Sequence, residues 1–168
     1  MKAGNATALS RRDLFGMRRQ DASGAPQALP PAAIAGEAFM RACDGCAECV
    51  SACDEKILRI EAGRARVDFA RGECTFCGRC VEACKPGALS AAALAAWSGR
   101  PVVAASCIGR AGVICRACGD ACGSGAIRFA IGAAGSPPSI DLAACNGCGA
   151  CVAPCPVAAL SIITEAAA

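Results

Sequence analysis

The chain of 168 residues contains no histidine and no tyrosine, and only one tryptophan and five phenylalanines. Without histidine it cannot form a Rieske centre, a His-ligated haem or a catalytic site that uses imidazole as acid or base. It also lacks the glycine-rich nucleotide-binding patterns GxGxxG and GKS. No candidate substrate site remains, so the sequence predicts a protein that is not an enzyme.

Bulky apolar residues are scarce as well. The hydrophobic fraction of 55% includes 41 alanines and 16 cysteines, which leaves 35 residues of Val, Ile, Leu, Met, Phe and Trp. Small domains with so little apolar bulk usually need cross-links or bound metals to fold. Residues 16–33 hold three charged residues and three prolines where a secretion signal needs an apolar run, and Arg100 and Pro101 interrupt the apolar stretch 87–108. We therefore expect a cytoplasmic protein without a membrane span.

Four copies of one pattern contain all sixteen cysteines. Three copies have the spacing Cys-x-x-Cys-x-x-Cys-x-x-x-Cys, and the third copy has seven residues instead of two between its first two cysteines. We number the copies motifs 1 to 4: CDGCAECVSAC (Cys43, Cys46, Cys49, Cys53), CTFCGRCVEAC (Cys74, Cys77, Cys80, Cys84), CIGRAGVICRACGDAC (Cys107, Cys115, Cys118, Cys122) and CNGCGACVAPC (Cys145, Cys148, Cys151, Cys155).

This spacing is typical of ligands to [4Fe–4S] clusters. Two-residue gaps let one tight loop bring three thiolates to a cluster, and glycines in the loop permit the close approach. Four-cysteine zinc sites normally use two separated Cys-x-x-Cys pairs, and a disulfide framework does not need one spacing four times. The sequence predicts four [4Fe–4S] clusters, with zinc and disulfides as alternatives. The alternative for the lengthened motif 3 is that Cys107 binds no iron or that the cluster there is labile.

The fourth cysteine of each motif is expected to bind the cluster of a neighbouring motif, as in bacterial two-cluster ferredoxins. Each site takes the number of the motif that supplies three of its ligands. The four sets are Cys43, Cys46, Cys49 and Cys84 (site 1), Cys74, Cys77, Cys80 and Cys53 (site 2), Cys107, Cys115, Cys118 and Cys155 (site 3), and Cys145, Cys148, Cys151 and Cys122 (site 4). Pairing motif 1 with motif 4 and motif 2 with motif 3 is the alternative.

Short apolar or alternating runs flank the motifs and predict strands. They are KILRIEA (56–62), ARVDFARGE (65–73), GALSAAA (87–93), GAIRFAI (125–131), PSIDLAA (138–144) and AALSIIT (158–164). The Ala-rich run 88–98 predicts a helix that ends before Gly99, with Trp97 packing between modules.

These elements predict an α+β protein with two tandem bacterial-ferredoxin-like modules made of short strands and helices. The first module is expected at 34–87 and the second at 101–165, with a helical connector at 88–100. Residues 1–33 have no apolar periodicity and are expected to form a basic, disordered tail.

The tail carries five basic residues and one acidic residue within positions 1–20. It contains the sequence from Ser10 to Phe15, SRRDLF, which is similar to the start of a twin-arginine export signal, but no apolar segment follows. This start, the four cysteine motifs and the unusual motif 3 together resemble the NapF ferredoxin-type proteins of bacterial periplasmic nitrate reductase systems.

The resemblance implies a cytoplasmic accessory protein that binds the catalytic subunit of a molybdenum-containing nitrate reductase before export and assists its iron–sulfur maturation. Arg11 and Arg12 are the candidate partner-binding residues, and a solvated tail without a partner is the alternative. The alternative function is an electron-transfer polyferredoxin subunit that relays electrons to a membrane or periplasmic oxidoreductase. No nucleic-acid partner is expected, because the sequence has no recognised nucleic-acid-binding motif.

Overall fold

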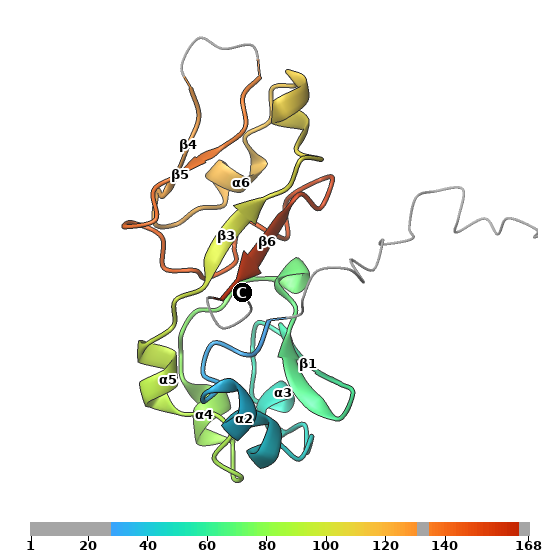
Figure 1. Cartoon of the computed structure of the whole chain (residues 1–168), viewed down its shortest axis with the longest axis vertical. Coiled ribbons are helices and arrows are strands. Elements are labelled where there is room, and N and C mark those ends of the chain that lie inside the picture. The colour runs from blue at the N-terminus through green and yellow to red at the C-terminus, as the bar shows by residue number, and fades with distance from the viewer. Residues whose placement is uncertain (1–27, 131–134, 165–168) are drawn as a thin grey trace, which may run out of the picture.

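The computed structural model describes residues 28–130 and 135–164, so Arg11 and Arg12 lie outside the described residues (Figure 1). Within these ranges the chain forms short helices and three two-stranded antiparallel sheets. The predicted α+β class is confirmed. No helix in the described ranges has the length and apolar character that a membrane span requires.

The first module contains three short helices and one hairpin. Helix α2 precedes motif 1, while α3 and α4 each form one turn inside a motif. The elements are α2 (Gly36–Ala42), α3 (Glu48–Ser51), β1 (Leu58–Glu61), β2 (Arg64–Val67), the 3-10 turn η1 (Phe69–Arg71) and α4 (Arg79–Glu82). Strands β1 and β2 pair antiparallel, with Leu58 opposite Val67. The hairpin therefore connects motif 1 directly to motif 2.

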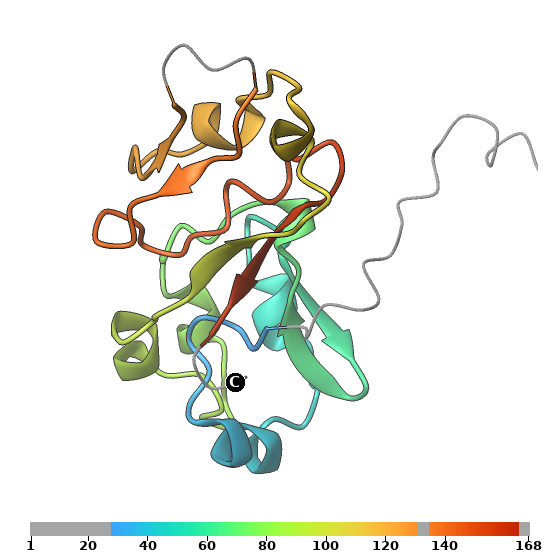
Figure 2. The same cartoon turned by 45° about the horizontal axis from the view of Figure 1, so that its top comes forward.

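The second module pairs its first strand with its last. The elements are β3 (Arg100–Val103), the 3-10 turn η2 (Ile108–Ala111), α6 (Ala117–Asp120), β4 (Ile127–Arg128), β5 (Ser139–Ile140) and β6 (Leu160–Ile163). Strands β3 and β6 pair antiparallel, as do β4 and β5. In both views, β3 and β6 lie between the end that holds α2 and the end that holds β4 and β5 (Figures 1 and 2).

Residues 28–33, which we expected in the disordered tail, pack against the first module instead. The side chains of Pro30 and Ala32 are fully buried. Ala33 forms an antiparallel bridge with Leu89, which lies five residues after Cys84, the last residue of motif 2. The expectation was wrong for this segment because backbone pairing, which leaves no periodic pattern in the sequence, holds it in place.

The connector 88–100 is helical only in its middle, as α5 (Ala91–Ala95). Ser90 is the N-cap of this helix, and its hydroxyl accepts a hydrogen bond from the amide of Ala93 at 3.1 Å. Serine in this position caps a helix, so the run 87–93 contributes only the bridge at Leu89 and no longer strand. Arg100, at the end of the expected connector, already belongs to β3.

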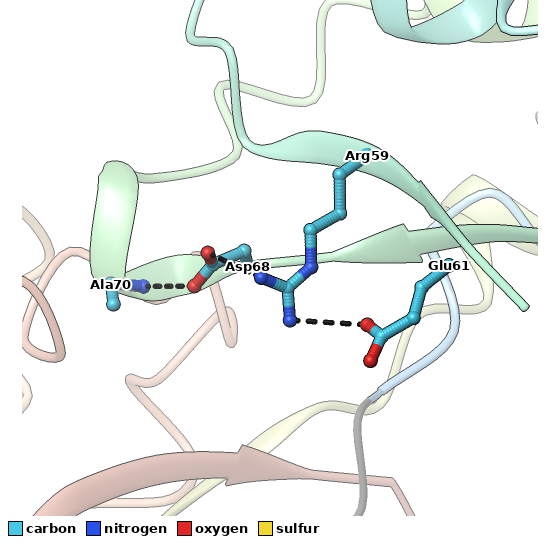
Figure 3. Close-up of polar contacts among 4 residues, drawn as sticks. All are labelled: Arg59, Glu61, Asp68 and Ala70. Atoms are coloured by element: carbon cyan, nitrogen blue, oxygen red, sulfur yellow. Dashed lines mark hydrogen bonds and ion pairs between the residues drawn. The ribbon is translucent and has the colours of Figure 1, made fainter. Parts of the chain in front are cut away.

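A polar network fixes the hairpin to the turn that leads into motif 2 (Figure 3). The guanidinium of Arg59 on β1 forms ion pairs with Glu61 and Asp68, each at 3.2 Å. Asp68 also accepts a hydrogen bond from the amide of Ala70 at 3.1 Å, which caps η1. The network therefore holds the buried Phe69 in a defined position.

Candidate iron–sulfur sites

Site 1 brings Cys84 of motif 2 to the first three cysteines of motif 1. Burial, followed by the neighbouring thiols of Cys43, Cys84 and Cys46, raises the pKa of Cys49 to about 11. The same four cysteines line one cavity beneath the fully buried Phe39. The fourth cysteine of motif 2 therefore lies against motif 1, as the cross-ligation rule requires.

Site 2 has the reciprocal arrangement, with Cys53 of motif 1 beside motif 2. Burial is the main cause that raises the pKa of Cys80 to about 11. The neighbouring thiols of Cys74, Cys77, Cys49 and Cys53 add to this effect. Cys53, Cys74, Cys77 and Cys80 also line a common cavity. An ion pair between Asp54 and Arg79 ties the two motifs together at this site.

In site 3, Cys155 of motif 4 lies near motif 3. Burial is the main cause that raises the pKa of Cys118, and the thiols of Cys115 and Cys155 add to it. The amide of Cys107 donates to the carbonyl of Ala104 at 3.2 Å, and η2 follows directly. The ligation of an iron by Cys107 stays a prediction.

In site 4, Cys122 of motif 3 lies near motif 4. Burial raises the pKa of Cys148, with Glu73, Cys122 and Cys145 contributing. Burial is the main cause that raises the pKa of Cys151 to about 12. The thiol of Cys148 adds to this effect, and those of Cys118 and Cys145 add less. The contacts in both modules therefore follow the local pairing, motif 1 with motif 2 and motif 3 with motif 4.

Several hydrogen bonds end on the fourth cysteine of a motif. The amide of Leu89 donates to Sγ of Cys84 at 3.4 Å, and the amide of Ala159 donates to Sγ of Cys155 at 3.2 Å. Such donors stabilise a thiolate and tune the reduction potential of a bound cluster. These hydrogen bonds could not be predicted from the sequence, because the direction of an amide depends on the fold and carries no signal in the residue type.

At Cys122 the hydrogen bonds to the sulfur outweigh the effect of burial. Burial raises its pKa, but hydrogen bonds from Ser124 and from the amides of Ala126 and Ile127 together lower it below the ordinary value. Its sulfur lies 3.5 Å from the hydroxyl oxygen of Ser124. The thiolate form, which a metal requires, is therefore favoured at this position.

The residue after the second cysteine adopts a left-handed backbone in three motifs. This residue is Ala47 in motif 1 (φ 64°), Gly78 in motif 2 (φ 79°) and Gly149 in motif 4 (φ 83°). In motif 3 its counterpart is Arg116, with φ −129°. The lengthened motif 3 therefore approaches its site along a different backbone path.

The donor sets fit iron–sulfur clusters. Each set consists of thiols, the soft ligands that iron–sulfur clusters select. Over residues 28–130 and 135–164, no group of three or more Cys, Asp or Glu side chains converges on the position of a single metal ion. Thiols that bind different irons of one cubane need not converge on one atom.

Two family models match the chain. A "4Fe-4S dicluster domain" matches residues 42–88, which contain motifs 1 and 2. A "4Fe-4S binding domain" matches residues 138–161, which contain motif 4. Motif 3, at 107–122, lies outside both matches. The chain therefore contains 4Fe–4S binding domains in both modules.

Proteins described as "Ferredoxin-type protein NapF" are similar over most of their length. Those of Escherichia coli K12, E. coli O6:H1 and E. coli O157:H7 are each 35% identical over 125 residues, which cover 73% of this chain and 76% of theirs. Ferredoxin-type proteins of this kind are electron carriers. The resemblance seen in the sequence is confirmed: the chain belongs to the NapF family of ferredoxin-type iron–sulfur proteins.

Proposed function

We propose that the protein is a cytoplasmic accessory protein that holds four [4Fe–4S] clusters and assists the iron–sulfur maturation of the catalytic subunit of a periplasmic nitrate reductase. The observation that carries the proposal is the gathering of thiols from neighbouring motifs into the sets of sites 1 to 4. The sixteen cysteines are the ligands. Bound clusters supply one-electron chemistry.

The cytoplasmic location is supported by the number and spacing of the cysteines. All sixteen lie in the described residues, in four closely spaced motifs. A chain with so many adjacent thiols needs a reducing compartment to keep them available for iron. The partner is supported by the family assignment and by the basic tail, where Arg11 and Arg12 are the proposed contact residues.

The second candidate is a polyferredoxin subunit that relays electrons to an oxidoreductase. Cys46 of site 1 and Cys77 of site 2 are exposed, which favours exchange of electrons at the surface. The two functions make different demands on the reductase. An accessory protein determines how completely the enzyme is loaded, whereas a relay determines how fast a loaded enzyme turns over.

Anaerobic reconstitution tests the four-cluster count. We expect about sixteen iron and sixteen acid-labile sulfide per chain, because each four-thiol set holds one cubane. Half that amount would contradict the four-cluster count, and zinc without sulfide would contradict the iron–sulfur assignment.

The cellular role is tested by the specific activity and cluster content of the exported reductase in deletion and complemented strains. We expect loss of the protein to lower the active fraction of the reductase more than its amount. Arg11→Ala combined with Arg12→Ala should weaken binding to the immature catalytic subunit without changing iron content, whereas Arg18→Ala with Arg19→Ala controls for the charge of the tail. A reductase that emerges fully loaded but lacks electrons in whole cells would favour the relay.

A further inference from the structure

The two modules meet where motif 2 faces motif 4. The amide of Cys74, the first cysteine of motif 2, donates a hydrogen bond of 2.8 Å to the carbonyl of Cys148, the second cysteine of motif 4. This bond joins the ligand loops of sites 2 and 4 directly, although they belong to different modules. Both cysteines are partly buried, so the loops exclude solvent from one another.

Two further contacts fix the same junction. The indole Nε1 of Trp97 donates to the carbonyl of Gly147 at 3.1 Å. Gly149 is buried against the ring of Phe69, and a Cβ atom added at Gly149 would overlap that ring. The Arg59 network shown in Figure 3 caps η1 and so holds Phe69 in place. The junction therefore combines a backbone hydrogen bond, an indole hydrogen bond and a close ring contact.

Within each module the two sites are also neighbours. In the first module, helix α3 of motif 1 contacts helix α4 of motif 2, and the ion pair between Asp54 and Arg79 joins the two motifs. In the second module, the pairing of β4 with β5 joins the end of motif 3 to the start of motif 4. The neighbour relations give one unbranched order: site 1, site 2, site 4, site 3. This order differs from the order of the motifs along the chain.

The geometry points to a single electron path through the whole chain, in which the junction of motifs 2 and 4 couples site 2 to site 4. This inference rests on the proposed binding of four clusters. Each transfer moves one electron, oxidising one site and reducing its neighbour without making or breaking a bond. The electron comes from a one-electron donor and leaves to a one-electron acceptor, so the charge of the chain returns to its starting value after each passage.

Gly149 offers a selective way to open the junction. Gly149 and Gly78 occupy equivalent positions with nearly equal φ angles of 83° and 79°. A Cβ at Gly78 meets no heavy atom within 4 Å, whereas one at Gly149 overlaps Phe69. Motif 1 carries alanine at this position, so the loop backbone accepts a methyl group. Gly78→Ala is therefore the reference for the strain of alanine alone, and Gly149→Ala adds the clash at the junction.

The main experiment compares full-length, reconstituted wild type, Gly78→Ala and Gly149→Ala by electron paramagnetic resonance after reduction with dithionite. Reduced clusters that lie close together broaden each other's signals and shorten spin relaxation. We expect Gly149→Ala at full iron content to lose the part of this interaction that crosses between modules, and Gly78→Ala to keep it. Equal spectra for the two alanine variants at equal iron content would overturn the inference.

Hydrogen exchange of the loaded wild-type chain gives a measurement that needs no variant. The amide of Cys74 should be protected, because its acceptor lies in the other module. Trp97→Phe keeps an aromatic ring but removes the indole donor, so we expect it to lower this protection. This variant replaces Gly149→Ala in the comparison if Gly149→Ala does not fold. Rapid exchange at Cys74 in the fully loaded wild type overturns the inference. An iron content well below sixteen per wild-type chain would instead contradict the proposed binding of four clusters.

Discussion

The two modules repeat the same pattern but bury apolar side chains very differently. In the first module and the start of the connector Phe39, Ile57, Leu58, Val67, Phe69 and Leu89 are buried, whereas among the described residues of the second module the buried apolar side chains larger than alanine or cysteine are Pro101, Leu160 and Ile162. Exposed large apolar residues show the opposite distribution: Met40 lies in the first module, and Val102, Val113, Ile114, Leu142, Val157 and Ile163 lie in the second. The first module has the core of a small domain, and the second depends more on its cysteines.

The strands differ in a complementary way. The hairpin between the motifs pairs four residues per strand in the first module (β1 and β2) and two in the second (β4 and β5). The pairing of the module ends is a single bridge in the first module and four residues per strand in the second (β3 and β6). The same repeated cysteine motif thus supports two distributions of strand pairing, because the cysteine loops are shared and the sequences that flank them differ between the modules.

The largest effect is expected from removing iron. Metal binding contributes directly to folding when the apolar core is thin. A chelator added to the loaded, reduced chain should therefore unfold the second module before the first. Hydrogen exchange at intermediate iron content should show β3 and β6 losing protection while β1 and β2 keep it. Simultaneous loss in all four strands, or the reverse order, would contradict the comparison.

Replacing the fourth cysteine of a motif should remove iron mainly from the site of its partner motif. Cys53→Ser is expected to remove about four irons from site 2, and Cys122→Ser about four from site 4. Iron content gives the loss, and hydrogen exchange of the ligand loops gives its location. Cys46→Ser, at an exposed position of site 1, is the matched control for loss of a thiol within its own motif. Loss confined to the motif that carries each substitution would contradict cross-ligation.

Phe39→Ala tests the core of the first module. Its side chain is fully buried, so truncation should cost about 3–5 kcal/mol of unfolding free energy. Phe129 in the second module is only partly buried and stacks on the guanidinium of Arg116, 5.4 Å from the ring centroid. Phe129→Ala should cost less. Denaturant titration of the loaded chain measures both, and equal losses would mean that the two cores carry equal weight.

The cysteine spacing predicted much of the arrangement of the sites. The cross-ligation rule placed Cys84 beside motif 1, and the structure has it next to Cys49. A cluster loop is short and its spacing fixed, so the sequence constrains which thiols can meet. The binding of iron by these thiols stays a prediction.

The junction between the modules could not be predicted in this way. The expectation that Trp97 packs between modules agrees with its hydrogen bond to Gly147. Nothing in the sequence indicated that Phe69 would meet Gly149, because a contact between modules depends on their relative orientation and leaves no periodic pattern. The helix α2 was missed for a similar reason, since seven residues are too few to show a helical period clearly.

The smallest expected difference concerns two equivalent aspartates. Asp68 accepts a hydrogen bond from the amide of Ala70 at 3.1 Å, and Asp141 accepts one from Ala143 at 3.0 Å. Asp68 also pairs with Arg59 at 3.2 Å, across side chains that are 22% and 38% exposed respectively. Asparagine keeps an oxygen that can accept the amide but removes the charge. The two Asp→Asn substitutions therefore separate the ion pair from the cap.

Asp68→Asn should lower the unfolding free energy of the loaded chain by about 0.2–1 kcal/mol, because a partly exposed ion pair contributes little more. Asp141→Asn should cost less than this at the same ionic strength. The denaturant midpoint of each variant, measured at low and at high salt, provides the comparison. Salt screens the attraction between Arg59 and Asp68, so the difference between the variants should shrink as salt rises. A difference that is absent at low salt, or that does not depend on salt, would show that the ion pair does not distinguish the two modules.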